Sequence, residues 1–356
     1  MLCSHAALMF SSFSFSSELQ VAILHFTVDP VTGANARATW ERVTCYNTKG
    51  EALPLGDQTW SEMAGRAYHS CVLLYNRYLL VIGGMQDSGS ILRPILLDTQ
   101  TWTWYTENIT VGDTAMNAIS EPSGRHGASL IADLEAHDRL LLFGGGSGSD
   151  LLRSGEDNAE VWELQMKGCT AETVLQSMPW EWHCVMDEPP ADSFSATDKL
   201  PLGRCHISTR VGRNTILFAF GSGRPTCNGL LGYRTDTNTF FSLTGSIQGS
   251  RPCDRFTCAA IYVEETGYWF IHGGYTSRQG GSPNGMCILD VAAALQRPFT
   301  LHPLDPRPIS YPLAEALAGP MNRTHTHTLP ALLRRLYQYR AGHDDSESSS
   351  SGWEED

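Results

Sequence analysis

Five arginines are the residues of this sequence whose type and spacing most suggest chemistry. Arg66, Arg125, Arg204, Arg255 and Arg323 each stand at the start of a short apolar segment. A guanidinium group binds carboxylates and phosphates through two parallel hydrogen bonds, so arginines around one rim could hold an acidic or phosphorylated peptide. The other interpretation is that they cap strands and pair with acidic residues of neighbouring units. The sequence leaves both interpretations open.

Metal and nucleophile chemistry has weaker support. His325 and His327 alternate, so on a strand they would share a face, but no third metal ligand accompanies them. The ten cysteines include no Cys-x-x-Cys pair. We expect them to be free thiols, buried where they lie in the apolar runs around Cys71, Cys205, Cys258 and Cys287, and typical of a reducing compartment. The sequence has no Gly-x-Ser-x-Gly, phosphate-binding glycine loop or His-Glu-x-x-His motif.

The composition favours a β-rich protein. Of the 356 residues 42% are hydrophobic and 18% charged, the latter below the roughly 25% of ordinary soluble domains. The 33 glycines are typical of many tight turns. A formal net charge of −13 opposes a general nucleic-acid binder. No apolar stretch approaches the roughly 18 residues of a membrane span, and we expect a cytoplasmic or nuclear location.

Four segments of the sequence repeat one pattern. Each has an arginine, an apolar run, a turn, and a second apolar run that ends in glycine. The arginine-to-glycine pairs are Arg66–Gly83, Arg125–Gly144, Arg204–Gly221 and Arg255–Gly273, with separations of 17, 19, 17 and 18 residues. Nearly constant spacing with variable residues between indicates an internal repeat. Near the centre of a ring, glycine would permit close backbone approach and positive φ.

The second half of each unit repeats as well. Residues 98–102 and 236–240 both read Asp-Thr-(Gln/Asn)-Thr-aromatic. We therefore predict four short strands per unit, the third ending at the acidic residue and the fourth starting at the aromatic one. In the first unit, Trp102 and Trp104 are predicted to share one face of the fourth strand. In the second, residues 177–186 are the candidate fourth strand.

These features resemble the kelch repeat, in which a double glycine follows an apolar strand and an aromatic residue precedes the fourth strand. The resemblance covers residues 18–329, and long loops stretch its period. The matching positions are Gly83, Gly84, Gly144, Gly145, Gly221, Gly223, Gly273 and Gly274, with the aromatic residues Trp102, Trp104, Trp162 and Phe240.

The resemblance implies an all-β kelch-type β-propeller with four complete four-stranded blades. Residues 18–43 look like the last two strands of a further unit, and residues 322–332 look like its first strand. Either both ends of the chain close a split fifth blade, or the propeller is incomplete. We expect residues 1–17 to be disordered, residues 330–342 to form a short helix or strand, and residues 343–356 to be a disordered acidic tail.

The resemblance also implies a function. In kelch domains the loops from second to third strands, and those between blades, bind partners. Those loops add Asp150, Arg153, Arg224 and Arg278 to the candidate binding residues. We expect a monomeric, non-catalytic protein-binding module without cofactor, nucleic acid or membrane contact, which as a substrate adaptor would meet ubiquitin-ligase components.

The alternative is a metal-dependent or oxidative enzyme on the same scaffold. Galactose-oxidase-like enzymes need a tyrosine, histidine and cysteine constellation that nothing here marks. The Glu-x-x-x-Asp-x-x-x-His pattern of the iron-dependent specifier proteins also fails, because Glu188 and Asp192 are followed by Ala196 where histidine is required.

Overall fold

A computed structural model describes the chain over residues 3–11, 20–28, 37–53, 65–86, 88–106, 121–133, 138–148, 157–166, 168–175, 180–186, 203–222, 230–243, 255–264, 266–275 and 286–291. Within these ranges the protein is all-β and has no α-helix, hence none that could span a membrane. The chain divides into two compact units. One comprises Met1–Phe10, Val21–Val43 and Pro312–Asp356, and the other comprises Ser11–Gln20 and Thr44–Tyr311.

The first unit contains a three-stranded sheet in the order β1 (Cys3–Ser11), β2 (Gln20–Val28) and β3 (Arg37–Arg42). β2 and β3 are the two strands predicted for residues 18–43, and they pair antiparallel with Leu24 opposite Trp40. The sequence predicted no regular structure for residues 1–17, whereas β1 is a strand that joins the sheet beside β2. Residues 292–356 lie outside the described ranges, so the shared fifth blade stays a prediction.

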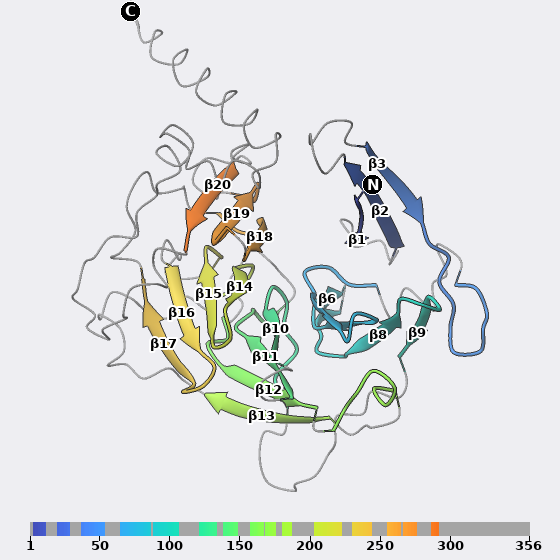
Figure 1. Cartoon of the computed structure of the whole chain (residues 1–356). Coiled ribbons are helices and arrows are strands. Elements are labelled where there is room, and N and C mark those ends of the chain that lie inside the picture. Colours follow the sequence, from blue (N-terminus) through green and yellow to red (C-terminus); the bar gives the residue numbers. More distant parts are fainter. Residues whose placement is uncertain are drawn as a thin grey trace, which may run out of the picture. The chain divides into compact units, whose positions relative to one another are not determined.

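The second unit contains four antiparallel sheets, which we call blades A to D in chain order (Figure 1). Blade A is β4 (Ser70–Leu74), β5 (Tyr78–Ile82), β8 (Ile95–Asp98) and β9 (Thr103–Tyr105), with a small hairpin of β6 (Met85–Gln86) and β7 (Gly89–Ser90). Blade B is β10 (Ser129–Asp133), β11 (Arg139–Phe143), β12 (Val161–Gln165) and β13 (Glu181–Met186). Blade C is β14 (Ile207–Val211), β15 (Thr215–Ala219), β16 (Leu230–Arg234) and β17 (Thr239–Ser242). Blade D, within the described residues, is β18 (Ala259–Val263), β19 (Tyr268–His272) and β20 (Met286–Asp290).

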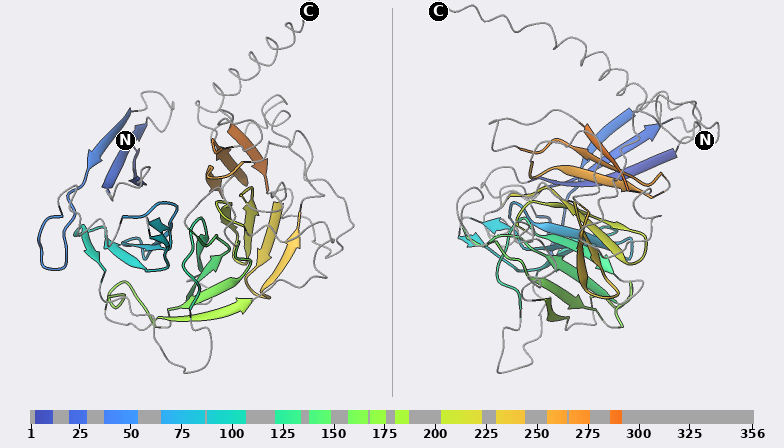
Figure 2. Two further views of the ribbon diagram at one scale, coloured as in Figure 1. Left: turned by 180° about the vertical axis from the view of Figure 1, so that it is seen from behind. Right: turned by 90° about the vertical axis from the view of Figure 1, so that its left-hand side faces the viewer.

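The four sheets form a β-propeller-like ring, as the sequence predicted. The first strands β4, β10, β14 and β18 contact one another in that order and lie innermost (Figure 2). The second strands come next, and all residues of β5 and β11 are buried. Burial on both faces explains the continuous apolar runs Leu79–Ile82 in β5 and Leu140–Phe143 in β11. Stacked blades thus bury surfaces that no single blade could cover alone.

Each blade interface has its own apolar core. Between blades A and B, Leu80 and Leu142 pack with Trp162 and its neighbours. Between blades B and C the core is aromatic: the ring centroid of Phe143 lies 4.8 Å from that of Phe218 and 5.1 Å from that of Tyr233, both in edge-to-face geometry. Fully burying one such side chain contributes roughly 1.5–3 kcal/mol. The C–D core is built around the buried Trp269.

The fourth strands correct one prediction. Trp102 does not share a face of β9 with Trp104, because it lies in the preceding turn with a φ of 57°. Asn238 takes the same place in blade C with a φ of 53°. Trp104 and Phe240 are the equivalent aromatic residues, since they lie opposite Leu97 and Tyr233 of the third strands.

In blade B the aromatic residue of the fourth strand follows the third strand only after a long insertion. Residues 177–186 were the predicted fourth strand, and β13 confirms this with Trp182 opposite Leu164. Trp162 lies instead on the third strand, opposite Leu142. Trp182 is therefore the match of Trp104, and the insertion before β13 hides it in the sequence.

Candidate functional site

The first strands begin and the second strands end at the same end of every blade, because they pair antiparallel. We call this end the glycine rim. It is defined by the two residues that follow each second strand, namely Gly83–Gly84, Gly144–Gly145, Phe220–Gly221 and Gly273–Gly274. The loops that were predicted to bind a partner all leave the blades here.

A collar of four residues lies at the inner edge of the glycine rim. Tyr68, Gly127, Cys205 and Thr257 have φ of 55°, 63°, 59° and 56°, all in the left-handed region. Consecutive collar residues join neighbouring blades, since the backbone N–H of Gly127, Cys205 and Thr257 donates to the preceding collar carbonyl at 2.7, 2.7 and 3.1 Å. The left-handed conformation directs the backbone N–H and carbonyl groups of the collar residues toward the neighbouring blades.

A second series of backbone bonds runs parallel to the collar. The N–H of Gly84 donates to the carbonyl of Arg125 at 2.8 Å, that of Gly145 to Gly203 at 3.1 Å, and that of Gly221 to Arg255 at 3.0 Å. Each blade thus holds the next by one donor and one acceptor. We call this pair of groups the backbone clamp. Its own hydrogen bonds use backbone atoms only.

The predicted arginines lie beneath this rim. Arg66, Arg125 and Arg255 donate from Nη1 to the carbonyl of the first glycine of their own blade, at 3.2, 3.2 and 3.1 Å. They are only 2%, 1% and 4% exposed. Arg125 also forms an ion pair with Glu160 at 2.7 Å. These contacts are those of the strand-capping interpretation, and binding of a partner by these side chains stays a prediction.

Burial has electrostatic consequences for Arg66. Loss of solvent lowers the pKa of its guanidinium to about 10, and the nearby charge of Arg93 adds to the effect. Such a group is still charged at neutral pH. Its charge is held by carbonyl oxygens inside the blade.

Repeat three is offset from the alignment that the sequence suggested. Arg204 forms with Ser222 the isolated bridge that Ala67 forms with Met85. Gly203 therefore takes the place of Arg66, and the predicted equivalence of Arg204 with the other arginines is wrong. Arg204 is 4% exposed and pairs with Asp157 at 2.8 Å.

The same offset moves the glycines of repeat three. Phe220 directly follows β15 and has a φ of 60°, so it stands where the other blades have their first glycine. Gly221, with a φ of 117°, is the second-position residue. The guanidinium of Arg255 lies 5.7 Å from the centroid of the Phe220 ring. Gly223, predicted as the second glycine, lies outside the described residues.

A serine–histidine contact occurs at the rim between blades A and B. Ser90 Oγ donates to the carbonyl of Gly148 at 2.7 Å and lies 2.8 Å from Nδ1 of His126. Burial lowers the pKa of His126 to about 4, and the charge of Arg204 contributes. A nucleophile and base need an orienting carboxylate, but Asp157 is bound by Arg204. The contact therefore ties the β6–β7 hairpin to blade B.

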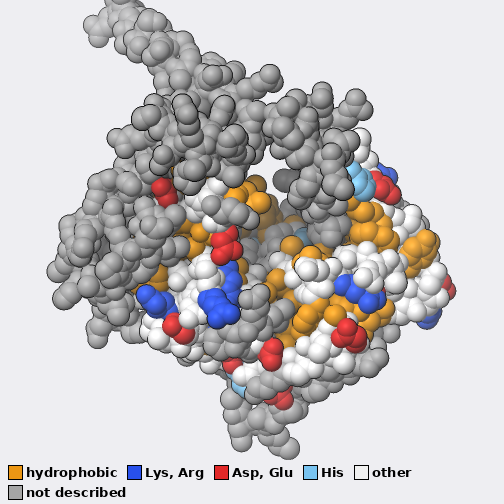
Figure 3. All heavy atoms as spheres, in the orientation of Figure 1, with side chains coloured by type: hydrophobic (Ala, Val, Ile, Leu, Met, Phe, Trp, Pro, Cys, Tyr) orange, Lys and Arg blue, Asp and Glu red, His pale blue; other side chains and the backbone are white. Residues whose placement is uncertain are grey.

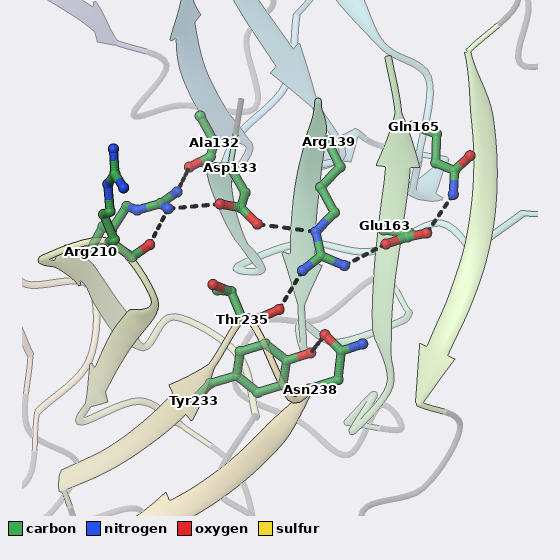
Figure 4. Close-up of polar contacts among 10 residues, drawn as sticks. Ala132, Asp133, Arg139, Glu163, Gln165, Arg210, Tyr233, Thr235 and Asn238 are labelled. Atoms are coloured by element: carbon green, nitrogen blue, oxygen red, sulfur yellow. Dashed lines mark hydrogen bonds and ion pairs between the residues drawn. The ribbon is translucent and has the colours of Figure 1, made fainter. Parts of the chain in front are cut away.

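The opposite end of blades B and C carries an ion network (Figure 4). The fully buried carboxylate of Asp133 accepts from Arg139 at 3.1 Å and from Arg210 of blade C at 2.7 Å. Arg139 also pairs with Glu163 at 2.7 Å and donates to the carbonyl of Thr235 at 2.7 Å. Burial raises the pKa of Glu163, but the hydrogen bonds from Arg139 and Gln165 and the charges of Arg139 and His183 together outweigh burial and hold it below its usual value. The network joins two blades and uses all its charges internally.

Four predicted binding residues, Asp150, Arg153, Arg224 and Arg278, lie outside the described residues. The structure fixes the ends of their loops at the glycine rim. These ends are Gly148 and Asp157, Ser222 and Leu230, and Tyr275 and Met286.

Two exposed aromatic residues at the rim were not predicted. Tyr68 and Tyr275 are each 38% exposed, and the ring of Tyr275 rests edge-on against Phe256 at 5.2 Å. Both stand beside the repeat motif, Tyr68 two residues after the arginine and Tyr275 directly after the double glycine. Their place beside that motif is the signal that could have found them.

The cysteines only partly match expectation. Cys205 is buried, Cys258 and Cys287 are half-buried, and Cys71 is exposed. Within the described ranges no group of three or more His, Cys, Asp or Glu side chains is placed to hold a metal. His325 and His327 lie outside those ranges.

No family model matches the chain, and no curated protein is significantly similar to it. The propeller arrangement therefore rests on the structure.

Proposed function

We propose that this protein is a kelch-type propeller that binds another protein through its glycine rim and performs no chemistry of its own. The observation that carries the proposal is the contrast within the rim. Its inner part is fixed by backbone bonds and buried arginines, and long loops start and end directly above it. Loops on a rigid scaffold are the usual site of recognition.

The collar and clamps make the rim a stable base. The six hydrogen bonds of the collar and the clamps cross the three interfaces between consecutive blades from A to D. The base presents loop ends at defined positions, so a partner would not have to order the scaffold when it binds. On the face that Figure 3 shows, basic and acidic side chains are interspersed over the described residues, so no single charge marks that face.

Tyr68 and Tyr275 support recognition of a protein. Tyrosine contributes a large apolar area and a hydroxyl at low entropic cost, and it is enriched among residues that dominate interfaces. The loops that carry Arg153, Arg224 and Arg278 would add recognition of carboxylate or phosphate groups. A substrate adaptor of a ubiquitin ligase, in the cytoplasm or nucleus, is the role that we propose from the kelch resemblance.

The test is a binding experiment with matched variants. The full chain is used as bait, and the partners that it captures are identified. The triple variant Arg153→Glu, Arg224→Glu and Arg278→Glu is expected to lose them, whereas Arg213→Glu, an exposed arginine in the β14–β15 turn at the other end of blade C, is expected to keep them. Equal capture by both variants would reject the rim. Metal analysis of the same preparation checks the enzyme alternative, which stoichiometric copper or iron would favour.

A further inference from the structure

We propose that Ser90 of blade A and Arg204 of blade C are positioning residues for the loop of blade B between β11 and β12. This loop comprises residues 149–156, which lie outside the described ranges, and it carries the candidate binding residues Asp150 and Arg153. The contacts that carry the inference are made at the two ends of the loop, which the structure describes. The inference rests on the proposed function only for what the loop binds.

The base of this loop is closed within blade B. The residues on either side of the loop are Gly148 and Asp157. Gly146 forms an antiparallel bridge with Asp157, and the N–H of Asn158 donates to the carbonyl of Gly145 at 2.8 Å. The loop therefore starts and ends at neighbouring points of the glycine rim, where groups from the adjacent blades can reach it.

Blade A holds the start of the loop through two linked hydrogen bonds. Ser90 Oγ lies 2.7 Å from the carbonyl oxygen of Gly148 and 2.8 Å from Nδ1 of His126. A carbonyl oxygen can only accept, so the Ser90 hydroxyl donates to Gly148, and Nδ1 of His126 carries the proton that it donates to Ser90. His126 is fully buried and is bridged to Gly146. Its ring therefore orients the Ser90 hydroxyl toward the start of the loop.

Blade C holds the end of the loop through an ion pair. Nε of Arg204 donates to Oδ1 of Asp157 at 2.8 Å. The Arg204 side chain is buried, and its backbone N–H and carbonyl bond to Ser222 at 3.0 and 2.8 Å. A charge-assisted hydrogen bond is roughly twice as strong as a neutral one. The end of the loop is thus tied to a residue that its own blade fixes in place.

The third glycine of blade B is explained by this arginine. A Cβ built on Gly146 would lie 2.8 Å from Nε and 3.0 Å from Cζ of Arg204. The other blades have Met85, Ser222 and Tyr275 at the equivalent bridge position, and the φ of Gly146 is outside the left-handed region, so the backbone there does not require glycine. Glycine at this position therefore leaves room for the guanidinium that holds the loop.

The two contacts arise from one position of the repeat. His126 and Arg204 are the bridge residues at the start of blades B and C, and each side chain reaches the rim of the preceding blade. The loop of blade B is consequently held by blade A at its start and by blade C at its end. Such a loop loses less conformational freedom when it binds a partner.

The experiment is limited proteolysis of the full chain with trypsin, which cleaves after arginine and needs no binding partner. Cleavage after Arg153 reports on the loop of blade B, and cleavage after Arg278, in the rim loop of blade D, is the internal reference. Ser90→Ala removes the hydroxyl that holds Gly148. We expect cleavage after Arg153 to accelerate roughly five- to tenfold and cleavage after Arg278 to stay unchanged. Ser90→Thr keeps the hydroxyl and should restore the parental rate.

A second variant tests the other end of the loop. Gly146→Ala places a methyl group where Nε of Arg204 lies, and the flexible end of that side chain can move without unfolding the blade. Arg204 should separate from Asp157, and cleavage after Arg153 should accelerate by roughly tenfold. Ser222→Ala puts the same residue at the equivalent position of blade C and is the matched control, which should leave this rate unchanged.

The outcomes separate this inference from the proposed function. A parental rate after Arg153 in Ser90→Ala would overturn the role of Ser90, and a parental rate in Gly146→Ala would overturn that of Arg204. Equal acceleration after Arg153 and Arg278 would indicate a general loss of stability and would overturn both roles. If the loop opens in Ser90→Ala while the partner captured by the full chain still binds, the positioning roles stand and blade B drops out of the proposed binding surface.

Discussion

Gly83 of blade A and Gly273 of blade D have almost the same backbone conformation and very different surroundings. Their φ values are 71° and 68°. A Cβ built on Gly83 would lie 2.6 Å from the carbonyl oxygen of Arg125 in blade B, whereas no described atom lies within 4 Å of a Cβ on Gly273. The repeat therefore sets the local conformation, and the neighbouring blade decides how tightly each position is packed.

Substitution of these two glycines by alanine should give the largest difference. In Gly83→Ala the strain of positive φ, about 1–2 kcal/mol, adds to a clash with backbone that cannot move cheaply. We expect Gly83→Ala to lower the free energy of unfolding by about 4 kcal/mol and Gly273→Ala by about 1 kcal/mol. Urea denaturation of both variants measures the values. Equal losses would show that blade B does not constrain Gly83.

The same contrast between a packed position and an open position applies to carboxylates, because one lies at the interface of blades B and C and another lies on an exposed turn. Asp133 is fully buried between Arg139 and Arg210. Asp133→Asn keeps the shape but removes the charge that both arginines share, and breaking such a buried pair should cost about 3 kcal/mol. Asp236→Asn, on the exposed turn of blade C, is the matched control and should change the free energy of unfolding by less than about 0.5 kcal/mol. A small effect at Asp133 would mean that water reaches the network.

Buried histidines should make this interface sensitive to acid. Burial lowers the pKa of His206 to about 4, below its ordinary 6.5, although a hydrogen bond to the carbonyl of Gly203 opposes the shift. The unfolded chain therefore takes up the proton first, so stability is full above pH 6.5 and falls as the pH drops toward 4. Between pH 6.5 and 4.5 we expect a loss of about 2 kcal/mol from this group alone.

The variant His206→Asn isolates that contribution. Asparagine can keep a donor near the carbonyl of Gly203 but does not titrate in this range. Urea denaturation at pH 6.5, 5.5 and 4.5 should show a flatter dependence than in the parent protein. An unchanged slope in His206→Asn would assign the acid sensitivity to other groups.

Much of the fold was predictable because the pattern reports local conformation. The apolar runs at residues 70–74 and 78–82 correctly predicted the hairpin of β4 and β5. The pattern of residues 177–186 correctly predicted β13, despite the insertion before it. The alignment failed at Arg204 and Trp102, where a residue of the expected type stands one or two positions from the place that the hydrogen-bond register requires. Register depends on the partner strand, which one sequence does not display.

The candidate site was less predictable for the same reason. The arginines stood out by type and spacing, yet three of them donate to carbonyls that belong to the turn after another strand. The collar was invisible because its members Tyr68, Gly127, Cys205 and Thr257 share a backbone conformation and no residue type. Of these four residues, only the glycine has a residue type from which a positive φ could be predicted.

The mixture of residue types in the collar leads to the prediction with the smallest expected change in stability. A β-branched residue is strained in the left-handed region, and Thr257 has a φ of 56° where blade B has Gly127. Asparagine tolerates this region, so Thr257→Asn should raise the free energy of unfolding by about 0.5–1 kcal/mol. Gly127→Asn is the contrasting variant, because a Cβ there would lie 2.6 Å from the backbone nitrogen of Cys205. It should be destabilising, and a gain at both positions in urea denaturation would mean that strain outweighs contact throughout the collar.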